Sequence, residues 1–206
     1  MLTIWGRANS GNVRKVLWCL EELGLAYERR DAGGAFGIVN DPAYRALNPN
    51  GLVPTLQDGA LTVWESGAIV RYLAARHGAG TLWPEDPAAR AVADQWMDWT
   101  GTTVQPAFGP AFVGLVRTPP EKRDTAAIAA SLAATAARLA IADAALARHP
   151  FLAGDRLTMA DIPLGAIVYG WFGLAAERPP LPHLEAWYNR LAARPAYRTG
   201  AMTPLT

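Results

Sequence analysis

The chain has 206 residues, a length that allows one or two domains with a sizeable buried core. Its 19 basic and 18 acidic side chains give a net charge of +1, and no basic stripe or long charge run is present, which argues against nucleic-acid binding. The single cysteine, Cys19, excludes an internal disulfide framework, a CxxC redox pair and a cysteine-based zinc site. The three histidines have no metal-ligand spacing, so no metal site is predicted.

Up to about residue 77, short strand-like runs alternate with helical patterns. We expect strands over residues 2–5, 27–31, 54–57 and 61–64, the last two joined by a turn at Asp58-Gly59. Helices are expected over residues 13–23, 42–47 and 66–77, with Gly24 as the C-cap of the first and Ser66 as the N-cap of the third. Cys19 lies in the body of the first helix and is expected to be a packed, unreactive thiol. This order predicts a mixed sheet covered by helices.

The remainder is helical almost throughout. Four helix breakers mark residues 78–87 as a linker between a domain over 1–77 and one over 88–206: Gly78, Gly80, Pro84 and Pro87. Leu82 and Trp83 in the linker are expected to pack back onto the second domain. Helices are expected over 87–104, kinked or broken by Pro106 and Pro110, over 126–148, and finally over 183–194, ended by Pro195.

The most apolar stretch covers residues 162–176. It is shorter than the roughly 20 residues of a membrane helix, so a buried core helix is expected. Thr158 and Asp161 in front of it have the spacing of a capping box. No signal peptide is visible, because Arg7 interrupts the N-terminal apolar run, and a cytoplasmic location is expected.

Ser10 and Asn12 stand between the first strand and the first helix. Free backbone N–H groups and the positive end of the helix dipole stabilise a thiolate in such a place, and a hydroxyl or amide adds a hydrogen bond to the charged form. Either residue could equally be a simple helix cap.

Two further segments also allow both a ligand-binding and a purely structural interpretation. With a cis peptide bond before Pro54, the backbone of Val53 would face outward and could pair with a bound peptide; the alternative is an ordinary strand that starts at proline. Glu65 and Ser66 open a helix, whose N-terminus can bind a carboxylate while Glu65 meets an ammonium; the alternative is a plain N-cap.

The order and spacing of these segments resemble the cytosolic glutathione transferases, most closely the bacterial theta-like and nu-like members. The matching stretches are 9–18 (NSGNVRKVLW), 47–56 (LNPNGLVPTL), 64–73 (WESGAIVRYL) and 151–161 (FLAGDRLTMAD). The resemblance implies an α/β thioredoxin-like N-terminal domain, an all-α C-terminal helical bundle domain, a cis Pro54 and a homodimer. It places Ser10 where theta-like enzymes have their thiolate-binding serine, and Asn12 where nu-like members have an asparagine; we favour Ser10.

The resemblance also implies the remaining site residues. Glutathione is expected to contact Val53, Pro54, Glu65 and Ser66. Many relatives carry lysine or histidine at the position of Gly51, so Asn50 is expected to substitute in holding the glycine carboxylate. Asp94 is expected either to line the pocket of the electrophile or to reach the γ-glutamyl ammonium across a dimer interface. Four aromatic residues are expected to line that pocket: Trp99, Phe108, Phe112 and Trp171.

The expected function is therefore that of a glutathione S-transferase, which uses glutathione as co-substrate and no metal. It would conjugate glutathione to a small hydrophobic electrophile, in detoxification or in a dedicated metabolic step. Two alternatives remain open at this point. One is a nu-like disulfide-bond reductase or peroxidase that uses glutathione; the other is a non-catalytic regulator built on the same fold.

Overall fold

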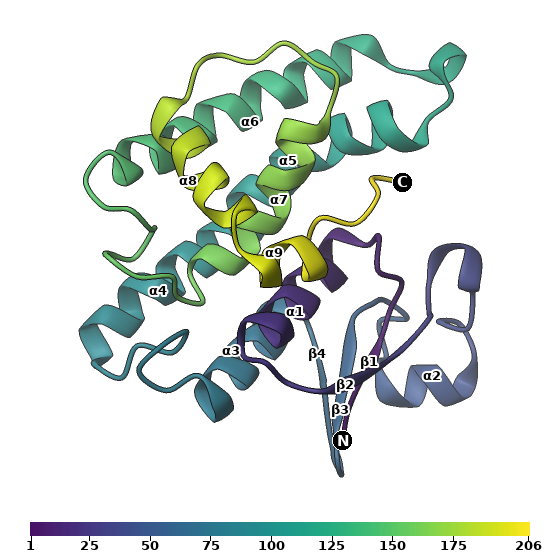
Figure 1. Cartoon of the computed structure of the whole chain (residues 1–206). Helices are drawn as coiled ribbons and strands as arrows, with labels where there is room; N and C mark the ends of the chain where they lie inside the picture. The colour runs from purple at the N-terminus through teal and green to yellow at the C-terminus, as the bar shows by residue number, and fades with distance from the viewer.

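The computed structural model describes residues 1–206 and begins with a four-stranded mixed sheet (Figure 1). The strands are β1 (Leu2–Trp5), β2 (Tyr27–Arg30), β3 (Thr55–Asp58) and β4 (Leu61–Trp64), in the order β2-β1-β3-β4. β1 pairs parallel with β2 and antiparallel with β3, and β3 pairs antiparallel with β4. Asp58 pairs with Leu61, so the hairpin turn consists of Gly59 and Ala60 and the predicted turn was one residue early. Gly59 has φ +59°, which suits glycine at the first position of a two-residue hairpin turn.

Three helices accompany the sheet: α1 (Gly11–Glu22), α2 (Pro42–Leu47) and α3 (Ser66–His77), with a 3₁₀ turn η1 (Gly34–Phe36) between β2 and α2. The C-cap of α1 is Leu23, so the predicted C-cap, Gly24, was one residue late, although Gly24 does end the helix. Gly24 has φ +62° and donates to Glu21, while the N–H of Leu25 bonds the carbonyl of Leu20, as in a Schellman motif. Ser66 is the first helical residue of α3, and the N-cap position belongs to Glu65, so the predicted cap was one residue late.

The second half contains α4 (Pro87–Trp99), η2 (Thr100–Val104), α5 (Gln105–Phe112), η3 (Val113–Arg117) and η4 (Pro120–Lys122). It continues with α6 (Thr125–Leu146), α7 (Asp161–Gly173), α8 (Pro182–Ala192) and α9 (Pro195–Gly200). The predicted final helix ends as expected before Pro195. It is not the last helix, because Pro195 occupies the first turn of α9, where its missing N–H costs nothing.

Of the two predicted effects of Pro106 and Pro110, a kink or a break, the break does not occur, because the helix passes both prolines with π-helical turns on either side, η2 and η3. A wider turn accommodates a proline ring without ending the helix. A side chain of α6 also hydrogen-bonds to backbone groups of α5 on either side of Pro110. The Ser131 hydroxyl donates to the carbonyl of Ala107 at 2.5 Å and accepts from the N–H of Ala111 at 2.9 Å. The side chain thus stands between two groups that a regular α-helix would pair with each other.

Thr158 and Asp161 are joined by the hydrogen bonds of a capping box, although α7 itself begins at Asp161 with Ala160 at the N-cap position. The N–H of Thr158 donates to the Asp161 carboxylate at 3.0 Å, and the Thr158 hydroxyl accepts from Ala160 at 3.3 Å. Asp161 is completely buried and also accepts from the N–H of Leu152 and from the indole of Trp187. α7 is the core helix predicted from composition, with ten of its residues buried.

One continuous apolar core joins the two halves, with α1 between the sheet and the helices α7 and α9 (Figure 1). Trp18 of α1 stacks edge-on against Tyr197 at 4.6 Å. Gly200 is required there, because a Cβ at this position would lie 2.4 Å from the Trp18 Cα atom. Leu82 of the linker is buried and its carbonyl accepts from Met159, which confirms the predicted return of this segment. α1 is therefore held rigidly from both sides.

The 22-residue helix α6 meets the length and hydropathy criteria for a membrane-spanning helix, with a mean hydropathy of 1.5. Core helices of soluble proteins meet the same criteria. α6 packs against α5 and α8.

Candidate active site

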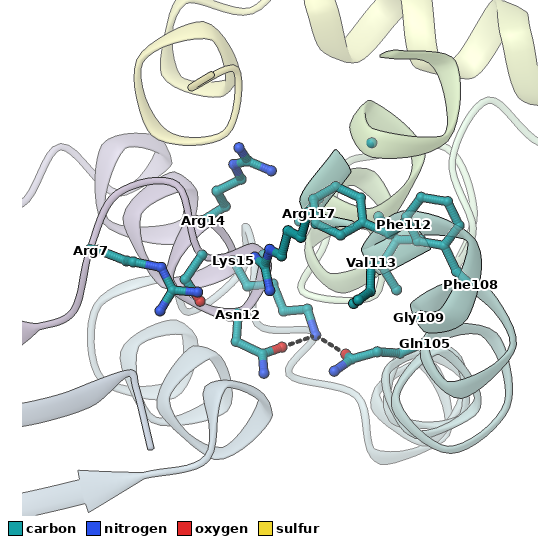
Figure 2. Close-up of a pocket in the computed structure, with 15 residues that line it drawn as sticks. Arg7, Asn12, Arg14, Lys15, Gln105, Phe108, Gly109, Phe112, Val113 and Arg117 are labelled. Carbon is teal, nitrogen blue, oxygen red and sulfur yellow. Dashed lines mark hydrogen bonds between the residues drawn. The ribbon is translucent and has the colours of Figure 1, made fainter. Parts of the chain in front are cut away.

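A cavity of about 240 Å³ opens at the N-terminus of α1, between that helix, the α5–η3 segment and α7 (Figure 2). Its α1 side is polar and includes Ser10, Gly11, Asn12, Arg14 and Lys15. Its opposite wall is apolar and includes Phe108, Phe112, Val113, Ala166 and Ile167. The cavity therefore joins the start of a helix to an apolar wall supplied by the other half of the chain.

Ser10 occupies the N-cap position of α1 with extended backbone angles, and it is 8 % exposed. Ser10 is thus the N-cap residue by position, but its side chain makes no capping hydrogen bond. The first amides of α1 and the Ser10 hydroxyl thus lie beside the cavity, where a helix N-terminus favours negative charge.

The Asn12 side chain is fixed by a buried lysine. Lys15 Nζ donates to Asn12 Oδ1 at 2.9 Å and to Gln105 Oε1 at 2.6 Å (Figure 2). An ammonium group can only donate, so the amide oxygen of Asn12 must face Lys15 and its NH₂ group must face away as a free donor. Burial lowers the pKa of Lys15 to about 8, against an opposing effect of Glu65. Neither Lys15 nor Gln105 was among the predicted site residues.

A second cavity of about 390 Å³ adjoins the first and shares Asn12, Lys15 and Gln105 with it. It is mostly polar and is also lined by Glu65 and Ser66 at the start of α3. Glu65 has φ +70°, a strained value for a residue other than glycine and one that clusters at functional sites. The structure therefore brings Ser10, Asn12, Glu65 and Ser66 to two adjoining cavities.

Asp94 lines neither cavity. Its carboxylate accepts from Arg71 Nε at 2.5 Å, and Arg71 also donates to Asp98 at 2.5 Å. The second cavity is lined instead by Arg71 and by Asp98, which lies one helical turn after Asp94. Neither residue was among the predicted site residues. Whether Asp94 faces the cavity depends on how α4 is rotated about its axis. The spacing of residues in the sequence does not give this rotation.

The Val53–Pro54 peptide bond is cis, as the resemblance implied. Asn50 is exposed, and its side-chain NH₂ group donates to Asn48 at 3.2 Å. Gly51 has φ +63°, and a Cβ there would lie 2.9 Å from the Val39 carbonyl oxygen. Glycine at this position is therefore dictated by the backbone of the loop.

Two of the four predicted aromatic residues, Phe108 and Phe112, line the first cavity. Trp171 is buried behind Phe108, with ring centres 6.2 Å apart, and Trp99 packs edge-on against Trp96 away from the cavity. Sequence spacing indicated apolar helix faces but not which one faced the cavity. Cys19 is completely buried, and burial raises its thiol pKa, as expected for an unreactive cysteine.

Sequence profiles identify the family. A profile described as "Glutathione S-transferase, N-terminal domain" matches residues 9–76, and one described as "Glutathione S-transferase, C-terminal domain" matches residues 100–195. The chain belongs to the glutathione S-transferase family. The resemblance, the fold class and the enzyme class predicted from the sequence are thereby confirmed.

Relatives of known name match over the whole chain. Glutathione S-transferase GstB of Escherichia coli (strain K12) is 48% identical over 208 residues, covering 100% of both chains. Glutathione S-transferase 3 of Zea mays is 34% identical, covering 99% of this chain and 95% of its own. The theta class glutathione S-transferase of Xanthomonas axonopodis pv. citri, solved with glutathione bound, has a TM-score of 0.97 and 60% identity, covering 100% of this chain and 99% of that one.

Proposed function

We propose that this glutathione S-transferase binds glutathione across the two cavities, activates its thiol at the start of α1 through Ser10 and Asn12, and transfers it to an electrophile. The observation that carries the proposal is the Asn12 amide, whose NH₂ group Lys15 leaves free beside an uncapped helix N-terminus. The glutathione-bound theta class relative supports the choice of co-substrate.

The predicted contacts divide by chemistry. The γ-glutamyl carboxylate would bind the first amides of α3 and the Ser66 hydroxyl, with its ammonium near Glu65. The backbone of Val53, next to Pro54, would pair with the cysteine residue of glutathione. Asp94 acts through Arg71 rather than by direct contact, which the 2.5 Å hydrogen bond between them supports. Asn50 would contribute at most weakly, because its amide is engaged with Asn48.

The reaction needs no covalent enzyme intermediate. The thiol loses its proton to solvent on binding, because the helix N-terminus and the donors from Ser10 and Asn12 stabilise the thiolate. The sulfur then attacks the electrophilic carbon: a C–S bond forms, and the leaving group departs with the electron pair of the broken bond. The contribution of the protein is positioning and a preorganised field.

We extend the proposal to the organisation of the chain. Residues 1–77 would hold glutathione and residues 88–206 the electrophile, with 78–87 as the linker. A cytoplasmic homodimer fits the family and the sequence expectations. Phe108 and Phe112 would contact the electrophile, whereas Trp99 and Trp171 would support the pocket from behind.

The test is the ultraviolet thiolate absorbance of bound glutathione against pH, in the parent protein, Ser10→Ala and Asn12→Ala, each saturated with ligand. We expect a depressed thiol pKa in the parent that rises in at least one variant, since each hydrogen bond to a charged group contributes about 1.5–3 kcal/mol. An unshifted thiol pKa in the parent, or no binding, would overturn the transferase mechanism. Faster reduction of hydroxyethyl disulfide than conjugation of aryl halides would instead favour the disulfide reductase.

A further inference from the structure

Four cationic side chains line the first cavity: Arg7, Arg14, Lys15 and Arg117. No carboxylate side chain is among its lining residues. The four cations come from distant parts of the chain, namely the loop before α1, α1 itself and the end of η3. None of the four forms an ion pair with an acidic side chain. The side chains that line the cavity therefore carry an excess of positive charge, which Glu65 offsets in part at Lys15.

Two of the four cations are already hydrogen-bonded to other groups of the protein. Arg14 donates to the Thr203 hydroxyl and to the carbonyls of Thr203 and Pro204, which ties the C-terminal segment to α1. Lys15 is held between Asn12 and Gln105. Both side chains are held in place by these bonds and contribute a fixed positive potential to the cavity.

The other two are available. The Arg7 guanidinium lies against Gly33 and Gly34 without a hydrogen bond, and burial and the charge of Arg117 lower its pKa. Arg117 uses only Nε, which donates to Thr206 at 3.2 Å, and its guanidinium lies 5.2 Å from the centre of the Phe112 ring. Figure 2 shows Arg117 directed from the apolar wall toward the start of α1. Its two NH₂ groups thus face the cavity beside an aromatic ring.

The backbone explains how Arg117 reaches this place. η3 is a π-helical turn, in which the N–H of Thr118 bonds the carbonyl of Val113 five residues back. The wider turn brings residues five apart onto one face, so Arg117 lies over Phe112 instead of pointing away from it. In a regular α-helix with about 3.6 residues per turn, side chains five residues apart, such as Phe112 and Arg117, would lie on different faces.

From this geometry we infer that the second substrate carries an anionic group, most simply a carboxylate. The anion sits between the guanidinium groups of Arg7 and Arg117, and the apolar body of the substrate lies against Phe108 and Phe112. The inference rests on the proposed function and refines the expectation of a purely hydrophobic electrophile. A glutathione thiolate offsets only one positive charge of four, so a second anion is still attracted. Planar, bidentate donors make arginine well suited to a carboxylate.

The reaction with such a substrate balances without another reactant. For a benzylic halide that carries a carboxylate, the thiolate sulfur forms the C–S bond, the C–Br bond breaks, and bromide leaves with the electron pair. The carboxylate is unchanged and only anchors the ring. The arginines act on substrate binding and orientation, and the thiolate remains the task of Ser10 and Asn12.

The experiment compares 4-(bromomethyl)benzoate with 4-(bromomethyl)benzamide, which differ in charge but hardly in shape, at fixed saturating glutathione. The proteins are the parent, Arg117→Gln, Arg117→Lys and the control Arg148→Gln, which removes an exposed charge that does not line the cavity. We expect Arg117→Gln to lower kcat/KM for the benzoate on the order of 10- to 100-fold, and for the benzamide less than about threefold. Arg117→Lys should retain part of the preference, and Arg148→Gln all of it.

Equal losses on the two probes, or a raised KM for glutathione in Arg117→Gln, would overturn the inference, because the arginine would then serve shape or glutathione. A binding arm separates this outcome from failure of the transferase proposal. The unreactive 4-methylbenzoate and 4-methylbenzamide are titrated calorimetrically into the parent protein. Tighter binding of the benzoate that weakens with salt and in Arg117→Gln supports the anion site even if no conjugation occurs. Equal affinity for both compounds, or no binding of either, refutes it.

Discussion

Lys15→Met should change the pH dependence of stability in a direction that the structure fixes. The ammonium is completely buried at the junction of the two halves, and its pKa is lowered from 10.5 to about 8, mainly by burial. Between these values the unfolded chain binds more protons than the folded one, so stability rises with pH across this window. The full change corresponds to about 3 kcal/mol. Below pH 8 the whole cost of the buried charge is present in the folded protein.

The variant removes this cost and leaves Asn12 and Gln105 without a donor. Each lost hydrogen bond costs about 1 kcal/mol, so the variant should be about 1 kcal/mol more stable than the parent at pH 7. It should also lack the rise between pH 8 and 10. Urea unfolding at equal protein concentration and at four pH values measures both effects, and the exposed Lys122→Met is the matched control.

The two lysines of the chain permit a direct check. With lysine labelled by ¹³C at Cε, NMR should give a signal that titrates near pH 8 and is absent from Lys15→Met. A Lys15 signal that titrates near 10.5, or parallel stability curves for the parent and Lys15→Met, would refute the claim that Lys15 is held as a buried charge. Because Lys15 orients Asn12, the variant should also lose roughly tenfold or more in kcat, with a raised pKa of bound glutathione.

Three further changes test other parts of the structure. Ser131→Ala should lower the free energy of unfolding by about 1–3 kcal/mol, since the buried N–H of Ala111 and the half-buried carbonyl of Ala107 lose their partner; a change below about 0.5 kcal/mol in urea unfolding would contradict the bridge. Asp161→Asn should cost about 2 kcal/mol or more, because an amide cannot accept from every N–H that the carboxylate serves, Trp187 included; a loss of near-ultraviolet Trp187 signal should accompany it. Gly51→Lys introduces the residue type that many relatives carry. It should nevertheless raise the KM for glutathione and lower Tm, because position 51 has φ +63° and its side chain would collide with Arg45. Tighter glutathione binding at unchanged Tm would show that the loop tolerates a side chain.

The sequence predicted elements whose signals are local. α1 follows from apolar spacing and from Gly24, which ends the helix, and α7 from its apolar composition and the capping box of Thr158 and Asp161. The β3–β4 hairpin was placed to within a residue, because turn chemistry is encoded in adjacent positions. The interpretation of the segments around Ser10, Val53 and Glu65 as one site depended on their order and spacing. That order and spacing also carried the resemblance to the family.

Errors arose where a local rule met a tertiary constraint. Pro106 and Pro110 should interrupt a helix on local grounds, but π turns and a hydroxyl from α6 let the chain continue. Pro195 was expected to end the helical region and instead began α9, whose Tyr197 packs on Trp18. In both cases packing against a helix distant in sequence outweighed the propensity of one residue.

By itself, the sequence determined the mixed sheet, the helical second half and the polar residues at the mouths of α1 and α3. Only the tertiary structure decided which cations meet at the cavity. Lys15 and Gln105 are 90 residues apart, and the π turn that aims Arg117 has no signal in composition. The physical reason is that short-range periodicity fixes which face of a helix is apolar, whereas the partner of a polar group depends on how two helices are rotated against each other.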